Sequence, residues 1–94
     1  MAAYVIGHII VKDPEKWEKY RKGVPGTLAP WGGEVILRGK RIEVLTGAHP
    51  YTDAVVIRFP DADAIARWYR SAEYQELIPT RKQAAEMVLI SYES

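Results

Sequence analysis

The sequence contains no cysteine. This absence excludes disulfide bonds, a thiolate nucleophile, iron–sulfur clusters and zinc fingers. Long apolar runs are also missing, since no stretch approaches the roughly 20 residues that a membrane-spanning helix needs. The first residues, Met1 to Tyr4, show neither the basic nor the apolar region of a signal peptide. We therefore expect a cytoplasmic protein without a membrane partner.

Neither charge sign dominates the sequence. Thirteen basic residues oppose twelve acidic ones, which leaves a formal net charge of +1. This balance lacks the basic footprint of a protein that binds nucleic acid or an anionic membrane. The hydrophobic content of 48% and the charged content of 27% are those of an ordinary globular protein. We expect one folded domain over residues 1–94 and no nucleic-acid partner.

The common catalytic fingerprints are missing as well. The sequence has no nucleophile elbow, phosphate-binding loop, dinucleotide-binding fingerprint or carboxylate pair at a useful spacing. Its two histidines, His8 and His49, have no carboxylate partner at metal-ligand spacing. The sequence therefore predicts no metal site and no cofactor.

Short β-branched runs alternate with helical apolar stripes along the chain. The predicted strands cover residues 3–11, 34–38, 41–46, 53–59 and 87–92. Gly39-Lys40 is expected to form a tight turn inside this series. The overall order β, α, ββ, α, β is that of the split βαβ unit. It predicts an α+β protein with a ferredoxin-like βαββαβ fold, an antiparallel sheet with its helices on one face.

Two helical sections are predicted between these strands. The first begins at Asp13-Pro14, where aspartate caps the helix and proline fits its first turn. Gly23 and Pro25-Gly26 are expected to kink it or divide it in two. The second begins at Asp61 and turns an apolar face inward, and short turns follow from Ser71 and Pro79. The apolar face of the second section consists of Ile65, Trp68 and Tyr69.

The strands are apolar on both faces, which a sheet with helices on one side does not need. In the first strand Ile6 and Ile10 point one way, whereas Val5, Ile9 and Val11 point the other. The helices can cover one face only, so the other would be an exposed apolar patch. An identical sheet is the simplest cover, and we expect a homodimer that pairs through the sheet face.

Several local sequences resemble one known family. They are Tyr4-Val5-Ile6, Asp13-Pro14, Tyr20-Arg21, Trp31-Gly32-Gly33, Leu37-Arg38-Gly39, Glu43-Val44-Leu45 and the run from Trp68 to Gln75 with Pro79 and Arg81. Over nearly the whole chain the sequence is similar to the small bacterial proteins grouped as domain-of-unknown-function family 1330. The resemblance implies the dimeric α/β-barrel superfamily, whose members include cofactor-less monooxygenases and haem-degrading enzymes. It implies fold and dimerisation and assigns no reaction.

His8 is the candidate catalytic residue. It lies in the middle of an apolar strand, where a neutral imidazole can act as a general base or proton shuttle. The alternative is a half-buried histidine with a structural hydrogen bond. His49 lies in a Gly/Pro loop and is expected to be solvated.

Two arginines and three tyrosines are the candidate ligand-binding residues. Arg38 ends a strand and Arg81 follows Pro79, and either can hold a carboxylate or enolate through two hydrogen bonds. The alternative for each is a structural ion pair, for instance with Glu43 or Glu73. At helical spacing aromatic rings are expected mainly in the core, but a tyrosine can still bring its polar tip to the helix–sheet cleft. They are Tyr20, Tyr69 and Tyr74.

Two functions remain open at this point. In the first, the protein binds or transforms a small organic acid or aromatic compound in the helix–sheet cleft, without a cofactor. In the second, it is a non-enzymatic accessory dimer with no small-molecule ligand. A third hypothesis, haem or metal binding through His8 or His49, depends on analogy with the superfamily alone.

Overall fold

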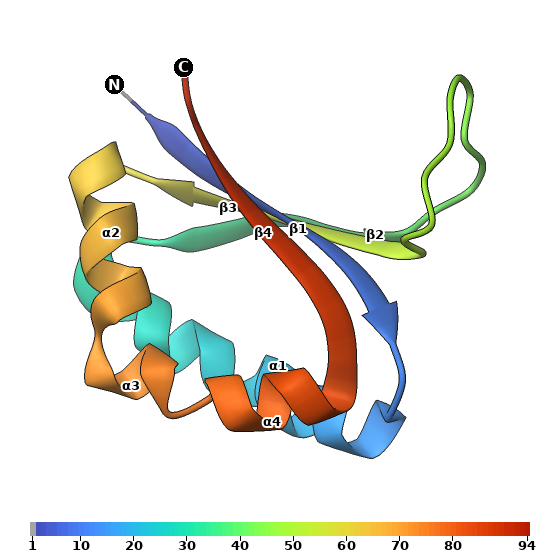
Figure 1. Ribbon diagram of the computed structural model, residues 1–94. Coiled ribbons are helices and arrows are strands. Elements are labelled where there is room, and N and C mark those ends of the chain that lie inside the picture. The colour runs from blue at the N-terminus through green and yellow to red at the C-terminus, as the bar shows by residue number, and fades with distance from the viewer. Residues whose placement is uncertain (1) are drawn as a thin grey trace.

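The computed structural model describes residues 2–94 (Figure 1). A four-stranded antiparallel sheet of order β2-β3-β1-β4 carries the helices on one face. The strands are β1 (Ala3–Val11), β2 (Glu34–Lys40), β3 (Asp53–Phe59) and β4 (Ala85–Glu93). The helices are α1 (Pro14–Leu28), a 3-10 turn over Ala29–Trp31, α2 (Ala62–Arg70), α3 (Ala72–Gln75) and α4 (Ile78–Ala84). The predicted α+β architecture is confirmed.

The predicted helix starts are confirmed by side-chain caps. The Asp13 carboxylate accepts a hydrogen bond from the backbone N–H of Lys16 at 3.2 Å. Asp61 accepts from Ala64 at 2.8 Å, and the Ser71 hydroxyl accepts from Tyr74 at 3.3 Å. Each cap satisfies one of the free N–H groups of a helix start. The sequence therefore fixes where α1, α2 and α3 begin.

Of the two expectations for the first helix, a kink or a division, the division into two shorter helices was wrong. α1 is one continuous helix that contains Pro25. Pro25 lies near the C-terminal end and is exposed, so its missing N–H removes one hydrogen bond without ending the helix. Close packing explains the glycine at position 23, because a Cβ on Gly23 would lie 2.9 Å from Cδ2 of Leu77. The glycine lets α1 approach the segment between α3 and α4.

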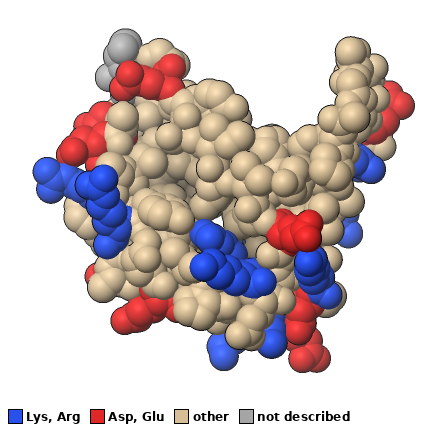
Figure 2. All heavy atoms as spheres, viewed as in Figure 1, with Lys and Arg blue, Asp and Glu red and all other residues tan. Residues whose placement is uncertain are grey.

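The predicted strand over residues 41–46 was also wrong. β2 continues through Gly39 to Lys40, and residues 41–52 form a loop that projects from the open side of the sheet (Figures 1 and 2). Arg41 closes its base, because the guanidinium donates to the carbonyl of His49 at 2.8 Å. Ile42 and Leu45 are 97% and 86% exposed. These residues have a high strand propensity, but no neighbouring strand lies beside them to share backbone hydrogen bonds.

The helix-facing side of the sheet holds the core. Its sheet residues include Val5, Ile9, Val55, Ile57 and Phe59, all at most 3% exposed. Against them pack buried residues of the helices, which include Tyr20, Val24, Leu28, Trp68 and Tyr74. None of the helices among residues 2–94 is long and apolar enough to cross a membrane.

The opposite face of the sheet is apolar and open to solvent, as the strand pattern predicted. Strand pairing places Leu37, Val56, Ile6 and Ile90 in one row across all four strands. Leu37 is 57% and Ile90 38% exposed. An aliphatic row of this kind is typical of a surface that another protein covers.

Candidate functional site

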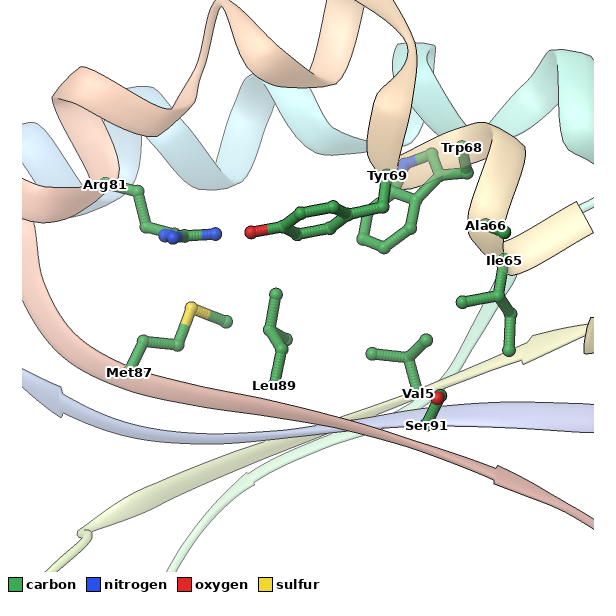
Figure 3. A pocket seen from close by; sticks show the side chains of 9 residues that line it. All are labelled: Val5, Ile65, Ala66, Trp68, Tyr69, Arg81, Met87, Leu89 and Ser91. Carbon is green, nitrogen blue, oxygen red and sulfur yellow. The ribbon is translucent and has the colours of Figure 1, made fainter.

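A cavity of about 380 Å³ lies between the helices and the β4 side of the sheet (Figure 3). Its volume is within the range of small-molecule sites. Helix α2 contributes Ile65, Trp68 and Tyr69, and α4 contributes Arg81. Its floor is formed by side chains of β1 and β4. They are Val5, Met87, Leu89 and Ser91.

Local sequence explains why these side chains converge. Strand alternation turns Met87, Leu89 and Ser91 to the helix side, because every second residue of a strand faces the same way. Pro79 lies in the first turn of α4, and Arg81 follows two residues later. In Figure 3 the Tyr69 hydroxyl points at the Arg81 guanidinium, across open space from Met87 and Leu89.

A hydrogen-bonded chain of polar groups lies behind the cavity. The hydroxyls of Tyr20 and Tyr74 are 2.9 Å apart, and Arg81 Nη1 donates to the Tyr74 hydroxyl at 2.8 Å. Tyr74 is fully buried and Tyr20 is 4% exposed. These contacts join α1, α3 and α4 around one guanidinium, so the position of Arg81 is fixed by the core.

Trp68 forms the inner wall of the cavity. Its indole Nε1 donates to the Thr27 hydroxyl at 3.0 Å, which itself donates to the carbonyl of Val24 at 2.7 Å. The rings of Trp68 and Tyr74 have centroids 4.3 Å apart. No buried side-chain nitrogen or oxygen in residues 2–94 lacks a hydrogen-bond partner, so this wall is preorganised.

The Arg81 guanidinium has no carboxylate partner within the part of the chain that the structure describes. The ion pairs there are Lys12–Glu86, Arg21–Glu18 and Arg67–Asp63. The alternative considered from the sequence, an ion pair between Arg81 and Glu73, is therefore not found among the described residues. Burial alone would lower the pKa of Arg81, but its interactions with Tyr74, Tyr69 and Tyr20 outweigh burial and raise it. Arg81 remains a half-buried cation beside an apolar cavity.

Tyr20 remains a neutral phenol. Burial, together with the neighbouring Tyr74, raises the pKa of Tyr20 far above its ordinary value of 10.0. A hydroxyl of this kind donates or accepts a hydrogen bond and does not act as a phenolate base.

The raised pKa of Tyr20 predicts a loss of stability in alkali. Above its ordinary pKa of 10.0 the unfolded chain releases this proton while the folded chain keeps it. The free energy of unfolding is therefore at its full value below about pH 10 and falls as the pH rises further. Urea titrations at several alkaline pH values give the slope of the free energy of unfolding against pH. This slope should be less steep for Tyr20→Phe than for the wild type, by an amount that corresponds to about one proton. Equal slopes in the two proteins would contradict this account.

Arg38 lies at the other end of the helix–sheet layer. It belongs to β2, pairs with Val55 and lines a second cavity of about 490 Å³ with Trp17 and Lys40. Partial burial lowers the pKa of Arg38, and the neighbouring Arg21 lowers it further. No acidic side chain of residues 2–94 forms an ion pair with Arg38, and Glu43 is not its partner. The two candidate arginines therefore line separate cavities.

His8 lies on the open face of the sheet, away from both arginines. The alternation of β1 turns Gly7 and Ile9 toward the helices and His8 away from them. Its ring lies 5.0 Å from that of His49 and 6.0 Å from that of Tyr51. His49 is half-buried against His8, so the expectation that it is solvated was wrong. No group of three metal-ligating side chains occurs among residues 2–94.

The structure brings Tyr20, Tyr69, Tyr74 and Arg81 close together. Tyr69 and Arg81 line the cavity, whereas Tyr20 and Tyr74 belong to the core behind it, and sequence reasoning missed other features. The His8–His49–Tyr51 cluster was missed because its members are far apart in sequence and meet only when the 41–52 loop folds back. Ser91 was missed too, although β-strand alternation with Met87 and Leu89 was a usable signal.

Comparison with known proteins concerns the family and the fold of the chain. A family model described as a domain of unknown function, DUF1330, matches residues 2–94. No curated protein matches the chain. A structure of the protein of unknown function RPA0582 from Rhodopseudomonas palustris has a TM-score of 0.84 and 16% identity, over 99% of this chain and 82% of the other.

Two further structures support the fold. A protein from Jannaschia sp. CCS1, described as a dimeric ferredoxin-like protein of unknown function, has a TM-score of 0.80 and 10% identity over 100% of both chains. SnoaB from Streptomyces nogalater, described as a cofactor-independent oxygenase, has a TM-score of 0.69 and 13% identity, over 99% of this chain and 92% of that one. At these identities the comparisons show that the fold is ferredoxin-like.

Proposed function

The chain belongs to the DUF1330 family of domains of unknown function, which assigns it no reaction, and we propose from its site that it binds a small organic acid. The acid lies in the cavity between α2, α4 and β4, with its carboxylate on Arg81 and its apolar body against the floor. No cofactor takes part. The observation that carries the proposal is the Arg81 guanidinium, half-buried at a cavity and without a carboxylate partner in residues 2–94.

The chemistry of the cavity supports an acid with an apolar body. Among residues 2–94, Arg81 is the one charged residue of its lining, Tyr69 and Ser91 add hydroxyl groups, and the Trp68 N–H is directed to Thr27. A guanidinium in a partly dry site gives strong hydrogen bonds to a carboxylate. The Tyr74 hydroxyl accepts a hydrogen bond from one of the five guanidinium N–H groups. The Tyr69 hydroxyl also interacts with the guanidinium, so the proposal assigns the ligand to the donors that these two phenols do not use.

The first test compares carboxylates with their amides. Octanoate and phenylacetate are titrated into the wild-type protein by calorimetry, beside octanamide and phenylacetamide. Arg81→Gln should weaken carboxylate binding by about tenfold to a hundredfold, since a hydrogen bond to a charged group contributes roughly 1.5–3 kcal/mol. It should leave the weak binding of the amides nearly unchanged.

Arg70→Gln is the matched control, because Arg70 is exposed at the end of α2 and does not line the cavity. It removes the same charge and should bind octanoate as the wild type does. The proposal is overturned if Arg81→Gln and wild type bind octanoate equally, or if the amides bind as tightly as the acids. If neither acid binds, the protein fits the alternative of an accessory dimer without a ligand.

We further propose that the protein is a homodimer through the open sheet face. The support is the aliphatic row of Leu37, Val56, Ile6 and Ile90, which a second copy would remove from water. Similar folds from Jannaschia sp. CCS1 and Thermobifida fusca are described as dimeric. This arrangement leaves the acid-binding cavity free, because the cavity lies on the helix side.

A further inference from the structure

Residues 41–52 form a narrow finger that stands out from the sheet between β2 and β3 (Figures 1 and 2). Residues 41–44 lead outward, bends at residues 45–47 reverse the chain, and the return arm enters β3 at Asp53. Gly47 has a φ of 90°, in the left-handed region that glycine enters without strain. The sequence therefore specifies a turn at the end of the finger.

The base of the finger is held by hydrogen bonds. The Arg41 guanidinium joins the two arms, because it donates to the carbonyls of His49 and Tyr51 at 2.8 and 3.3 Å. The Arg41 backbone N–H donates to the carbonyl of Thr52 at 2.7 Å, and the Thr52 N–H donates to the carbonyl of Ile9 at 3.0 Å. Since Ile9 belongs to the central strand β1, the finger is anchored to the sheet and projects in a defined direction.

The outer part of the finger is apolar and lies apart from the core. Ile42 is 97% and Leu45 86% exposed, and residues 41–48 are all exposed. The core cluster of residues 2–94 includes no residue of the finger. Single exposed aliphatic residues are common on protein surfaces, but these two lie on an anchored projection, where they cannot join the core of their own chain.

The direction and length of the finger indicate what it contacts. It projects on the side of the sheet opposite the helices (Figure 1), where the aliphatic row that begins at Leu37 is open to solvent. An extended arm of five residues, as from Lys40 to Leu45, spans about 16–18 Å. Two sheets that pack face to face lie only about 10 Å apart. A second copy on the open face would therefore lie beside the finger, which is long enough to pass the level of that copy's sheet.

We propose that the finger is a dimerisation arm, and that Ile42 and Leu45 of each protomer pack against the body of the other. This inference rests on the proposed homodimer and deepens it by naming a second contact outside the sheet face. Two-fold symmetry uses both fingers of the dimer in the same way. The occupant is a second copy of this chain, because the finger and the apolar sheet face lie on the same side of the molecule.

The first test locates the end of the finger in the dimer. Because the sequence has no cysteine, Leu45→Cys can be labelled at that position alone with a benzophenone maleimide. Irradiation of a mixture of light and ¹⁵N-labelled protein should yield covalent dimers whose cross-linked peptides join a light chain to a heavy one. Glu76→Cys is the matched control, because Glu76 is exposed at the end of α3 on the helix side, and it should yield no covalent dimer.

The second test measures the contribution of the two aliphatic side chains. Ile42→Ser combined with Leu45→Ser should raise the dissociation constant of the dimer at least about a hundredfold, since each side chain is withdrawn from water twice in the dimer. Glu43→Ser changes a polar residue of the same finger and should leave the dissociation constant nearly unchanged. Circular dichroism should show all three proteins folded, because the finger contributes nothing to the core cluster.

The outcomes separate the arm from the homodimer. If the wild type is a dimer but the label at position 45 reacts only within its own chain, or if the double serine variant dimerises as tightly as the wild type, the arm is wrong and the sheet-face dimer stands. An effect of Glu43→Ser as large as that of the double variant would also overturn the arm. Binding of the wild type to phosphatidylcholine vesicles, lost in the double variant without any change in dimerisation, would assign the finger to a lipid surface instead. If the wild type is a monomer at every concentration, both proposals fail.

Discussion

Trp68→Ala is expected to destabilise the protein by about 3–5 kcal/mol, which is the usual range for removal of a large buried aromatic side chain. Trp68 is 1% exposed, and its ring contacts those of Phe59 and Tyr74, with centroids 5.4 and 4.3 Å away. A small domain has a total stability of roughly 5–15 kcal/mol. The variant should therefore unfold at much lower urea concentration and lose the preformed cavity wall.

Two companion variants show where the loss comes from. Trp68→Phe keeps an aromatic ring but removes the N–H that binds Thr27, so its loss should be clearly smaller than that of the alanine variant. Trp31→Ala removes the same side chain from a half-exposed position beside the core and should cost less as well. A Trp68→Ala protein no less stable than Trp31→Ala would contradict this account of the core.

The sequence predicted the helix α2 and its apolar face, but not how deeply each residue of that face is buried. Ile65, Trp68 and Tyr69 were predicted as one apolar face, yet the structure buries Trp68 and leaves Tyr69 39% exposed. A helical period shows which residues share a face and not how far each penetrates the core. The difference matters here, because the cavity lies beside Tyr69 and the core contact belongs to Trp68.

Strand prediction succeeded where a neighbouring strand was present. β1 and β3 have the predicted bounds, and both are central strands of the sheet. Residues 41–46 have similar β propensity but lie beyond the point where β2 and β3 pair at Lys40 and Asp53. Propensity predicts a strand, whereas a strand needs a partner for its hydrogen bonds.

The kinds of residue that a site in the cleft would use were predictable from the sequence. The separation of Arg38 and Arg81 into two different cavities was not. The residue types at Arg38, Arg81 and Tyr74 pointed to anion binding in an aromatic cleft. Their placement depends on long-range register: Arg38 is on an edge strand and Arg81 on α4 beside the opposite edge. His8 lies on the opposite face of β1 from Val5 and Ile9, which face the helices. Because both faces of this strand are apolar, the sequence did not show which face the helices cover.

Ile6→Glu is expected to convert the proposed dimer into monomers. Ile6 lies on the central strand β1 of the open face, between Val56 of β3 and Ile90 of β4. A carboxylate buried there without a partner costs several kcal/mol, and two-fold symmetry brings one from each protomer into the same interface. The dissociation constant should rise on the order of a thousandfold or more, which sedimentation over a series of protein concentrations measures.

The same variant distinguishes an interface from the core. Ile6 is only half-buried in the isolated chain, so the Ile6→Glu monomer should remain folded and should still bind octanoate through Arg81, on the far side of the sheet. Ala62→Glu adds the same charge at the exposed start of α2, where an acidic group suits the helix, and should remain dimeric. A wild-type protein that sediments as a monomer at every concentration, or an Ile6→Glu protein as dimeric as Ala62→Glu, would show that the apolar row is not the interface. A folded, acid-binding monomer would instead establish that the sheet serves assembly with one face and ligand binding with the other.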